Sequence, residues 1–150
     1  MHIKYDPIHL NDDEDDTFDK ITCIRTFIRI EPLRKNGKEV TDLVIPATYT
    51  YKGNKYKITG IDYMVFMDNN FLTSVTIPDS VTSIENLTFG QCTNLTSIII
   101  PNSVTTIKNM PFEGCTSLTS IIIPDSVTSM GDDVFINCNN LTIYCVDESM

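Results

Sequence analysis

The sequence predicts a β-rich right-handed solenoid of short parallel strands, capped at its N-terminal end by a β-hairpin. Three consecutive segments, 73–95, 96–118 and 119–141, repeat one pattern every 23 residues without a gap. One row of this size cannot bury its own apolar side chains, so neighbouring rows must stack and share a core. Proline, phenylalanine and cysteine each recur at one position of the row: Pro78, Pro101 and Pro124; Phe89, Phe112 and Phe135; Cys92, Cys115 and Cys138.

An acidic segment precedes the repeats. Residues 1–19 include the run NDDEDD at 11–16, and a block of like charges predicts a solvated, flexible tail. Clustered oxygens also attract calcium, but this run lacks the spaced acids, central glycine and final glutamate of an EF-hand loop. We therefore expect a single domain over 20–150, with capping strands at 20–40 and repeats at 41–146.

The capping strands are predicted from the alternation of side chains. The segment KITCIRTFIRI at 20–30 alternates apolar and polar residues, as a half-buried strand does. An Asn36-Gly37 pair follows, which is a common two-residue hairpin turn, and then the segment KEVTDLVI. These features predict a hairpin that covers the first row.

A looser copy of the repeat lies upstream of the three regular rows. The segments TDLVIP at 41–46 and ITGIDYMVFMDNNFL at 58–72 place Ile61 and Phe66 in register with the later rows. The residues inserted between the two segments contain a Gly-Asn pair at 53–54, flanked by tyrosines and lysines. This composition predicts an inserted hairpin.

Within each row the apolar pattern alternates twice. The first strand points alternate side chains inward and ends at the proline, which cannot donate a ladder hydrogen bond. A DSV or NSV turn follows, and VTSI then returns apolar side chains to the core. A short helical or irregular turn carries the phenylalanine inward before the next row begins. For one central row, the expected core residues are Leu95, Ile98, Ile100, Val104 and Ile107.

The repeat LTSIxIPxSVTxIxxxxFxxCxxL resembles the leucine-rich repeat family, specifically its BspA-like subclass, over about residues 40–146. The resemblance implies a leucine-rich repeat stack with an N-terminal entry module. Two rows depart from the pattern. Met130, Asp132 and Asp133 replace the usual residues of the last row, and Asn69 occupies the cysteine position of the first. Terminal rows of repeat proteins are commonly atypical, so both departures fit the fold.

The charge of the chain argues against nucleic acid and anionic membranes as partners. Residues 1–58 hold ten basic and ten acidic residues, whereas 59–150 hold Lys108 alone against ten acids, which gives the net charge of −9. An acidic surface repels phosphate backbones and anionic lipids. No apolar run reaches the length of a membrane span, and the N-terminus lacks the apolar region of a signal peptide. As written, the sequence predicts a cytoplasmic protein without membrane insertion.

No set of catalytic residues emerges from the sequence. The two histidines, His2 and His9, lie in the acidic tail, so no thiol or hydroxyl has a neighbouring base, and no glycine-rich phosphate loop occurs. The repeated cysteines form a line rather than a converging metal site, and stacked rows orient them poorly for disulfides. We expect buried small hydrophobes, with Cys145 on the outer face of the last strand as the most reactive thiol. We expect no enzyme activity, cofactor or metal ion.

The candidate binding residues are expected on the outer face of the first strand of each row. The first column is apolar where water favours polar side chains, and its neighbour is small and flat, so the two could form a shallow recognition strip. Isoleucine also suits a pleated strand for packing reasons alone, and two adjacent isoleucines form too small a patch to be diagnostic. Both interpretations stay open. The expected columns are Val44, Thr76, Ile99, Ile122 and Cys145, and Asp42, Ser74, Ser97, Ser120 and Ile143.

Non-catalytic protein–protein recognition is the function that we predict. The resemblance implies adhesion or surface binding, and with it a cell-surface or secreted location. The alternative is a structural stacking or assembly module without a dedicated ligand site. The last strand, TIYCV at 142–146, begins a further row and stops. Its open edge predicts a contact with another copy of the chain, with another domain or with a crystal neighbour, and self-association is the version that solution measurements can test.

Overall fold

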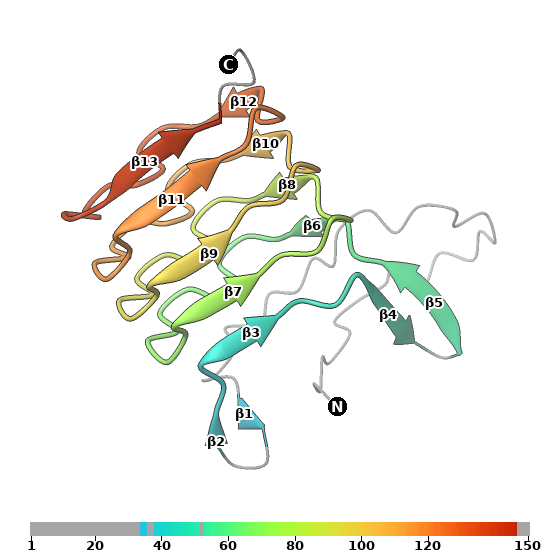
Figure 1. Cartoon of the computed structure of the whole chain (residues 1–150). Helices are drawn as coiled ribbons and strands as arrows, with labels where there is room; N and C mark the ends of the chain where they lie inside the picture. The colour runs from blue at the N-terminus through green and yellow to red at the C-terminus, as the bar shows by residue number, and fades with distance from the viewer. Residues whose placement is uncertain (1–33, 36–37, 52, 147–150) are drawn as a thin grey trace.

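The structure of the chain is a computed structural model that describes residues 34–35, 38–51 and 53–146. The acidic tail predicted at 1–19 and the capping strand predicted at 20–30 lie outside the described residues. The described chain winds into a solenoid of about four turns of parallel strands, and no helix occurs in that part (Figure 1). The predicted solenoid is confirmed.

Two sides of the solenoid consist of parallel strands from successive rows. Most pairs join residues 23 positions apart, such as Ser74 with Ser97 and Ile84 with Ile107, which is the spacing that the sequence period predicts. On the first side, β7 pairs with β3 and with β9, and β11 pairs with β13. The first side contains β3 (Asp42–Val44), β7 (Ser74–Thr76), β9 (Ser97–Ile99), β11 (Ser120–Ile123) and β13 (Thr142–Cys145), and the second contains β6 (Gly60–Ile61), β8 (Ser83–Ile84), β10 (Thr106–Ile107) and β12 (Ser129–Met130).

The third side consists of irregular turns. Each turn uses two residues with positive φ, for example Leu87 at 54° and Gln91 at 59°. The N–H groups of Leu87, Phe89 and Gln91 donate to carbonyl oxygens of the next row at 3.2, 2.8 and 2.6 Å. The same three positions donate in the rows before and after, so the turns form a ladder of their own along the stack.

Phenylalanine rings occupy the centre of the core. Neighbouring ring centroids are 5.3, 5.7 and 5.5 Å apart, and the ring planes are within 10° of parallel. Ile61 pairs with Ile84, so the looser upstream copy is in the predicted register. The predicted inward residues of the central row are all buried. The stacked rings are those of Phe66, Phe89, Phe112 and Phe135.

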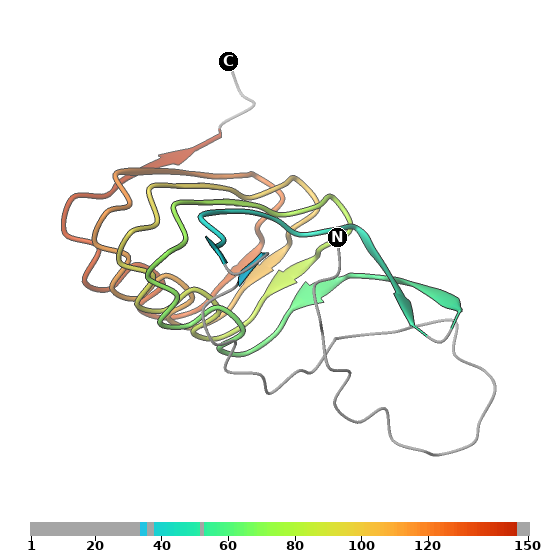
Figure 2. The same ribbon diagram turned by 90° about the horizontal axis from the view of Figure 1, so that it is seen from below.

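In the part of the chain that the structure describes, two antiparallel hairpins flank the first turn of the solenoid. β4 (Thr48–Tyr51) and β5 (Asn54–Lys57) project away from the stack, at the place where the sequence predicts an insertion (Figures 1 and 2). Asn54 pairs with Tyr51, so it begins the second strand instead of occupying the turn, and Gly53 supplies the positive φ of 83°. β1 (Arg34–Lys35) and β2 (Lys38–Glu39) pair with each other and lie across the opening of the first turn in Figure 2.

The last strand pairs one residue out of the predicted register. The repeat alignment expects Cys145 and Ile143 in the outer columns, and the structure contradicts both placements. Because a shift of one residue turns each side chain to the opposite face, Ile143 and Cys145 share the inward-facing side and Tyr144 faces outward. This register keeps a tyrosine hydroxyl out of an apolar interior. The observed pairs are Ser120–Thr142, Ile121–Ile143, Ile122–Tyr144 and Ile123–Cys145.

Asn69, at the cysteine position of the first row, is a buried amide without a partner. Its side chain is 3% exposed, and neither its Oδ1 nor its Nδ2 has a hydrogen-bond partner among the described residues. In the following row Cys92 holds the same position and donates its thiol to the Phe66 carbonyl at 3.1 Å. The two rows share the same backbone hydrogen bond at this position: Asn69 N donates to Phe66 O, and Cys92 N donates to Phe89 O, both at 3.2 Å.

Replacing Asn69 with cysteine is therefore expected to stabilise the protein by about 1 kcal/mol, because an unpaired buried amide costs about 1–3 kcal/mol. Thermal unfolding under reducing conditions should show a melting temperature higher by about 2–4 °C. Asn69→Asp is the isosteric control, and its buried carboxylate should lower stability at pH 7. A cysteine variant less stable than the parent protein would contradict the assignment.

Candidate protein-binding site

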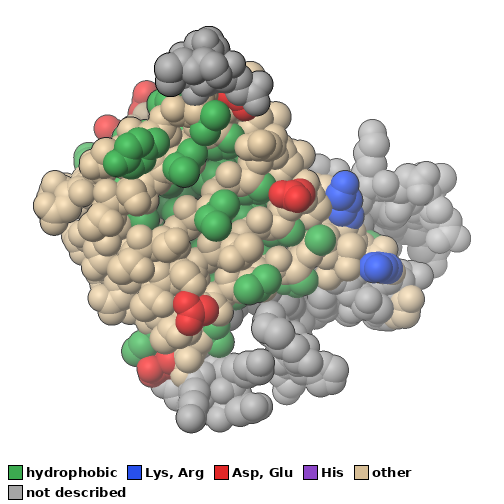
Figure 3. Space-filling view, viewed as in Figure 1, with side chains coloured by type: hydrophobic (Ala, Val, Ile, Leu, Met, Phe, Trp, Pro, Cys, Tyr) green, Lys and Arg blue, Asp and Glu red, His purple; other side chains and the backbone are tan. Residues whose placement is uncertain are grey.

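An exposed, largely apolar column crosses the first side of the solenoid. Four of its five side chains are large and apolar, with exposed fractions of 61% for Val44, 65% for Ile99, 57% for Ile122 and 56% for Tyr144. Thr76 holds the remaining position, and strand pairing aligns it with Val44 on one side and Ile99 on the other. We call these five residues the outer strip. Hydrophobic side chains gather over these strands in Figure 3.

Strand alternation holds the outer strip on a rigid support. In β9, Ile99 is exposed, whereas Ile98 and the following Ile100 are buried in the core. Ile122 has the same position between two buried isoleucines in β11. The strip side chains lie on the face of the strands opposite to the buried core residues. Packing between outer-face neighbours contributes only about 0.2–1 kcal/mol per pair. Core packing therefore does not explain why these positions are apolar.

A column of small polar residues runs beside the outer strip. Its members are Asp42, Ser74, Ser97, Ser120 and Thr142. At one end, Ser74 Oγ donates to Asp42 Oδ1 at 2.5 Å, and Thr41 Oγ1 donates to Asp42 Oδ2 at 3.0 Å. The hydrogen bond from Ser74, followed by that from Thr41, lowers the pKa of the Asp42 carboxyl group. The column is therefore flat along most of its length, with a fixed negative charge at its first row.

All seven binding residues predicted from the sequence lie on this one face. Tyr144 is the member that the repeat alignment missed, because the alignment carried the 23-residue spacing one strand too far. The signal that could have identified it is the alternation within TIYCV, where Tyr144 is the polar-tipped side chain between Ile143 and Cys145. The seven predicted residues are Val44, Thr76, Ile99, Ile122, Ser74, Ser97 and Ser120.

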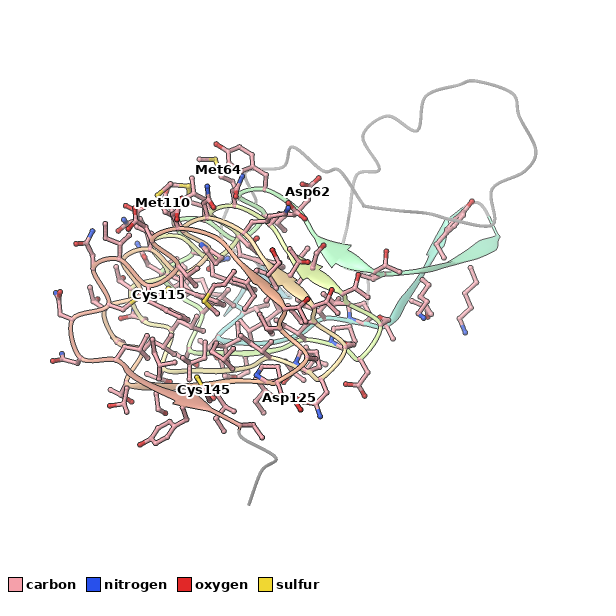
Figure 4. The ribbon with its side chains drawn as sticks, turned by 90° about the horizontal axis from the view of Figure 1, so that it is seen from above. Asp62, Met64, Met110, Cys115, Asp125 and Cys145 are labelled. Carbon is pink, nitrogen blue, oxygen red and sulfur yellow. The ribbon has the colours of Figure 1, made fainter. Side chains whose placement is uncertain are left out.

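The cysteine column is structural. Each thiol donates to the carbonyl of the phenylalanine one row earlier, at 3.1 Å for Cys92, 3.2 Å for Cys115 and 3.0 Å for Cys138. Burial raises the pKa of Cys92 to about 12, so this thiol stays protonated at neutral pH. Figure 4 shows Cys115 inside the ring of strands, whereas Cys145 lies on the last strand, where its thiol is exposed. The expected buried, backbone-bonded thiols are confirmed for the first two positions.

The described residues hold no group of three or more His, Cys, Asp or Glu side chains placed to bind a metal ion. Both histidines lie outside the described residues. Lys and Arg side chains on the face in Figure 3 lie at the projecting hairpin, whereas acidic side chains lie over the solenoid itself. The outer strip is thus an apolar line on an acidic body, a surface suited to contact with another protein.

The repeat architecture matches a known family. The family described as "BspA type Leucine rich repeat region (6 copies)" matches residues 57–150, which is more than half of the chain. This chain belongs to the BspA-type leucine-rich repeat family. Leucine-rich repeat proteins are generally non-enzymatic, and their repeats usually mediate protein–protein binding.

Several solved structures are similar to this BspA-type chain. A leucine-rich repeat protein from Bacteroides capillosus is 36% identical, with a TM-score of 0.67 over 72% of this chain and 78% of that one. A leucine-rich repeat protein from T. pallidum is 26% identical, with a TM-score of 0.60 over 70% and 51% of the two chains. A leucine-rich cell surface protein from Faecalibacterium prausnitzii is 28% identical, with a TM-score of 0.57 over 73% and 37%.

This BspA-type chain thus spans about three quarters of the Bacteroides capillosus protein, but about half of the T. pallidum protein and little more than a third of the Faecalibacterium prausnitzii protein. The search of curated proteins found no match to it. In the described residues, no helix has the length and apolar character needed to cross a membrane.

Proposed function

We propose that this chain is a non-catalytic protein-recognition module and that it binds its partner through the outer strip. The observation that carries the proposal is one line of exposed, large apolar side chains from Val44 to Tyr144. In the central strands these exposed residues alternate with isoleucines that are buried in the core. The flat polar column beside the strip leaves an unobstructed approach for a partner surface.

Surface binding or adhesion is the setting that we propose for this recognition. It is supported by the family membership and by the likeness to a protein described as a leucine-rich cell surface protein. A partner that covers the strip would desolvate Ile99 and Ile122 at its centre, and central, fully desolvated side chains carry most of the energy of a protein interface.

Replacing both Ile99 and Ile122 with aspartate should weaken partner binding about 100-fold without unfolding the protein. Both side chains are more than half exposed, and substitutions at such positions usually change stability by less than about 0.5 kcal/mol. Losing two central contacts of about 1.4 kcal/mol each predicts a dissociation constant about 100-fold higher. The measurement is interferometry against immobilised, purified extracellular-matrix proteins, with thermal unfolding of each variant recorded in parallel.

Ile136→Asp is the matched control, because Ile136 is an isoleucine exposed on the turn side, away from the strip. It should bind as the parent protein does. If the double aspartate variant binds the partner as tightly as the parent protein does, the outer strip is not the binding site. If the parent protein binds none of the matrix proteins, the adhesion setting is wrong.

The second candidate function is a structural module that assembles through its last strand. Among the described residues β13 pairs only with β11, and a free edge on its other side favours this candidate, because exposed edge strands readily pair with other chains. The two candidates can be distinguished by experiment. Partner recognition requires the outer strip and is possible for a monomer. Assembly requires the edge of β13 and should persist when Ile99 and Ile122 are replaced with aspartate.

A further inference from the structure

Exposed carboxylates border the outer strip on both of its long edges. Beyond the strands of the central rows, a turn is closed by a hydrogen bond from a valine N–H group to a proline carbonyl at 3.0 or 3.1 Å. The residue after the proline is Asp79, Asn102 or Asp125 in successive rows, and all three are exposed. Figure 4 shows Asp125 on the same side of the solenoid as Cys145 of β13. On the opposite edge of the strip, Asp42 is exposed in the small polar column. We call Asp42, Asp79 and Asp125 the acidic rim.

No basic side chain of the described first side offsets the acidic rim. The strands of that side and their proline turns contain neither lysine nor arginine, and Lys108, the sole basic residue between 59 and 146, follows β10 on the second side. In Figure 3 the lysine and arginine side chains lie at the projecting hairpin, outside the face that carries the strip. A partner that covers the strip therefore meets an apolar line with negative charge along its edges.

We propose that the outer strip binds an amphipathic α-helix of a partner protein, with an apolar stripe lying along the strip and lysine or arginine side chains over the acidic rim. The inference rests on the proposed function, because it specifies the partner of the same surface. The aliphatic stems of lysine and arginine cover the edges of an apolar contact while their charged ends reach the carboxylates. An acidic helix would be excluded by repulsion from the same carboxylates.

The spacing of the outer strip matches the pitch of a helix. Neighbouring strands lie about 4.8 Å apart, so successive strip side chains from Val44 to Ile122 follow one another at that distance. One turn of an α-helix rises about 5.4 Å, which keeps an apolar stripe close to register over this length. In an extended segment, the side chains of one face lie about 6.8 Å apart and lose register within two strands. A helix is therefore the segment that fits.

The small polar column leaves room for the helix beside the strip. Ser97 and Ser120 precede Ile99 and Ile122 by two residues, so each serine faces outward from the same strand as its isoleucine. Serine is the smaller side chain, so the isoleucines stand above this column as a ridge. Side chains that flank the apolar stripe of a helix can pack into the lower column, as ridges pack into grooves between helices.

Three synthetic peptides of about 18 residues test the helix and its charge. All three carry leucine at every third or fourth position, which forms one apolar stripe. The first has lysines beside the stripe, the second has glutamates at the same positions, and the third is the lysine peptide with two interior prolines that prevent a helix. By fluorescence anisotropy in about 50 mM salt, the lysine peptide should bind about 30-fold more tightly than the glutamate peptide and at least about tenfold more tightly than the proline peptide. Raising the salt to about 0.5 M should weaken the lysine peptide about tenfold.

Neutralising the acidic rim tests where the lysine peptide binds. The triple variant Asp42→Asn, Asp79→Asn and Asp125→Asn should weaken its binding about tenfold, because three exposed ion pairs are lost. Asn102 already holds the equivalent turn position of the row between Asp79 and Asp125, so the amide suits this turn. Thermal unfolding recorded in parallel should match that of the parent protein.

The matched control removes the same number of charges away from the strip. Glu85 follows β8 on the second side, and Asp132 and Asp133 lie on the turn side. The triple variant Glu85→Gln, Asp132→Asn and Asp133→Asn has the same net charge as the rim variant. It should bind the lysine peptide within about twofold of the parent protein, because exposed charges more than about 10 Å away are largely screened at ordinary salt.

The outcomes separate this inference from the proposed function. Equal binding of the lysine and glutamate peptides, equal binding of the lysine and proline peptides, or no binding of the lysine peptide at about 1 mM overturns the basic helix. So does an equal effect of the two triple variants. In each case the proposed function still stands if the double aspartate variant loses its partner. Ile99→Ser with Ile122→Ser removes the apolar contact without adding charge and should weaken the lysine peptide about 100-fold. Unchanged binding in that variant would overturn the strip as the site, and this inference with it.

Discussion

Replacing Phe112 with alanine is expected to lower the free energy of unfolding by about 3–5 kcal/mol, the range for removing a fully buried phenylalanine. The Phe112 side chain is 0% exposed, and its ring stacks on Phe89 at 5.7 Å and on Phe135 at 5.5 Å. The substitution therefore leaves a cavity and also breaks two ring contacts at the centre of the stack. Urea denaturation followed by circular dichroism measures the loss.

Phe135→Ala is the control for position in the stack. The Phe135 ring is only partly buried and stacks on a single neighbour, so its removal should cost at least about 1 kcal/mol less than that of Phe112. The gradient follows from the solenoid, in which each row is stabilised by the rows on either side. Equal losses for the two variants would mean that the rings act independently of their place in the column.

The sequence period was sufficient to predict the fold because the period is also the hydrogen-bond register. A repeat of 23 residues puts equivalent residues side by side in adjacent rows, so one alignment predicts the strand pairs, the phenylalanine column and the cysteine column together. The looser first copy followed the same rule, since Ile61 and Phe66 both lie in register with their equivalents. The alternation of apolar and polar residues within each strand and the 23-residue repeat predicted the same register. A fold is predictable when local pattern and long-range pattern agree in this way.

The repeat predicted the wrong register for the last strand, where the 23-residue alignment and the local side-chain preference disagree. The 23-residue alignment points Tyr144 inward, whereas the polar tip of tyrosine favours the outer face. No described row follows β13 to hold the alignment, so the side-chain preference decides and the strand shifts by one residue. That shift gives the outer strip its fourth large apolar member, so the candidate site gained most where the sequence prediction was wrong.

Asn69 shows a second limit of the sequence. The repeat alignment identifies it as a departure from the cysteine column, but the alignment does not say whether the amide finds a partner or stays buried without one. That outcome depends on distances of a few tenths of an ångström between stacked rows. The same is true of close backbone approach, which no residue pattern reveals.

Gly131 lies at a close approach between the last row and the row before it. Its N–H group donates to the Ile107 carbonyl at 2.8 Å, and the next residue, Asp132, donates its N–H to Asn109 Oδ1 at 3.1 Å. A Cβ atom on Gly131 would lie 2.7 Å from the Lys108 carbonyl carbon and 2.8 Å from the Asn109 backbone nitrogen. Backbone atoms cannot move aside as a flexible side chain can, so the last row would have to lift away.

Gly131→Ala is therefore expected to cost about 3 kcal/mol, the upper end of the range for overpacking. Gly90→Ala is the matched control, because its new Cβ would meet Leu87 Cδ2 at 3.3 Å, the end of a flexible side chain. Neither glycine has a left-handed φ, so both substitutions restrict the unfolded chain alike and should otherwise stabilise by about 0.4–1 kcal/mol. The difference between the changes in unfolding free energy caused by the two substitutions therefore measures the effect of the close approach at the last row. A difference near zero would show that this row can move outward at little cost.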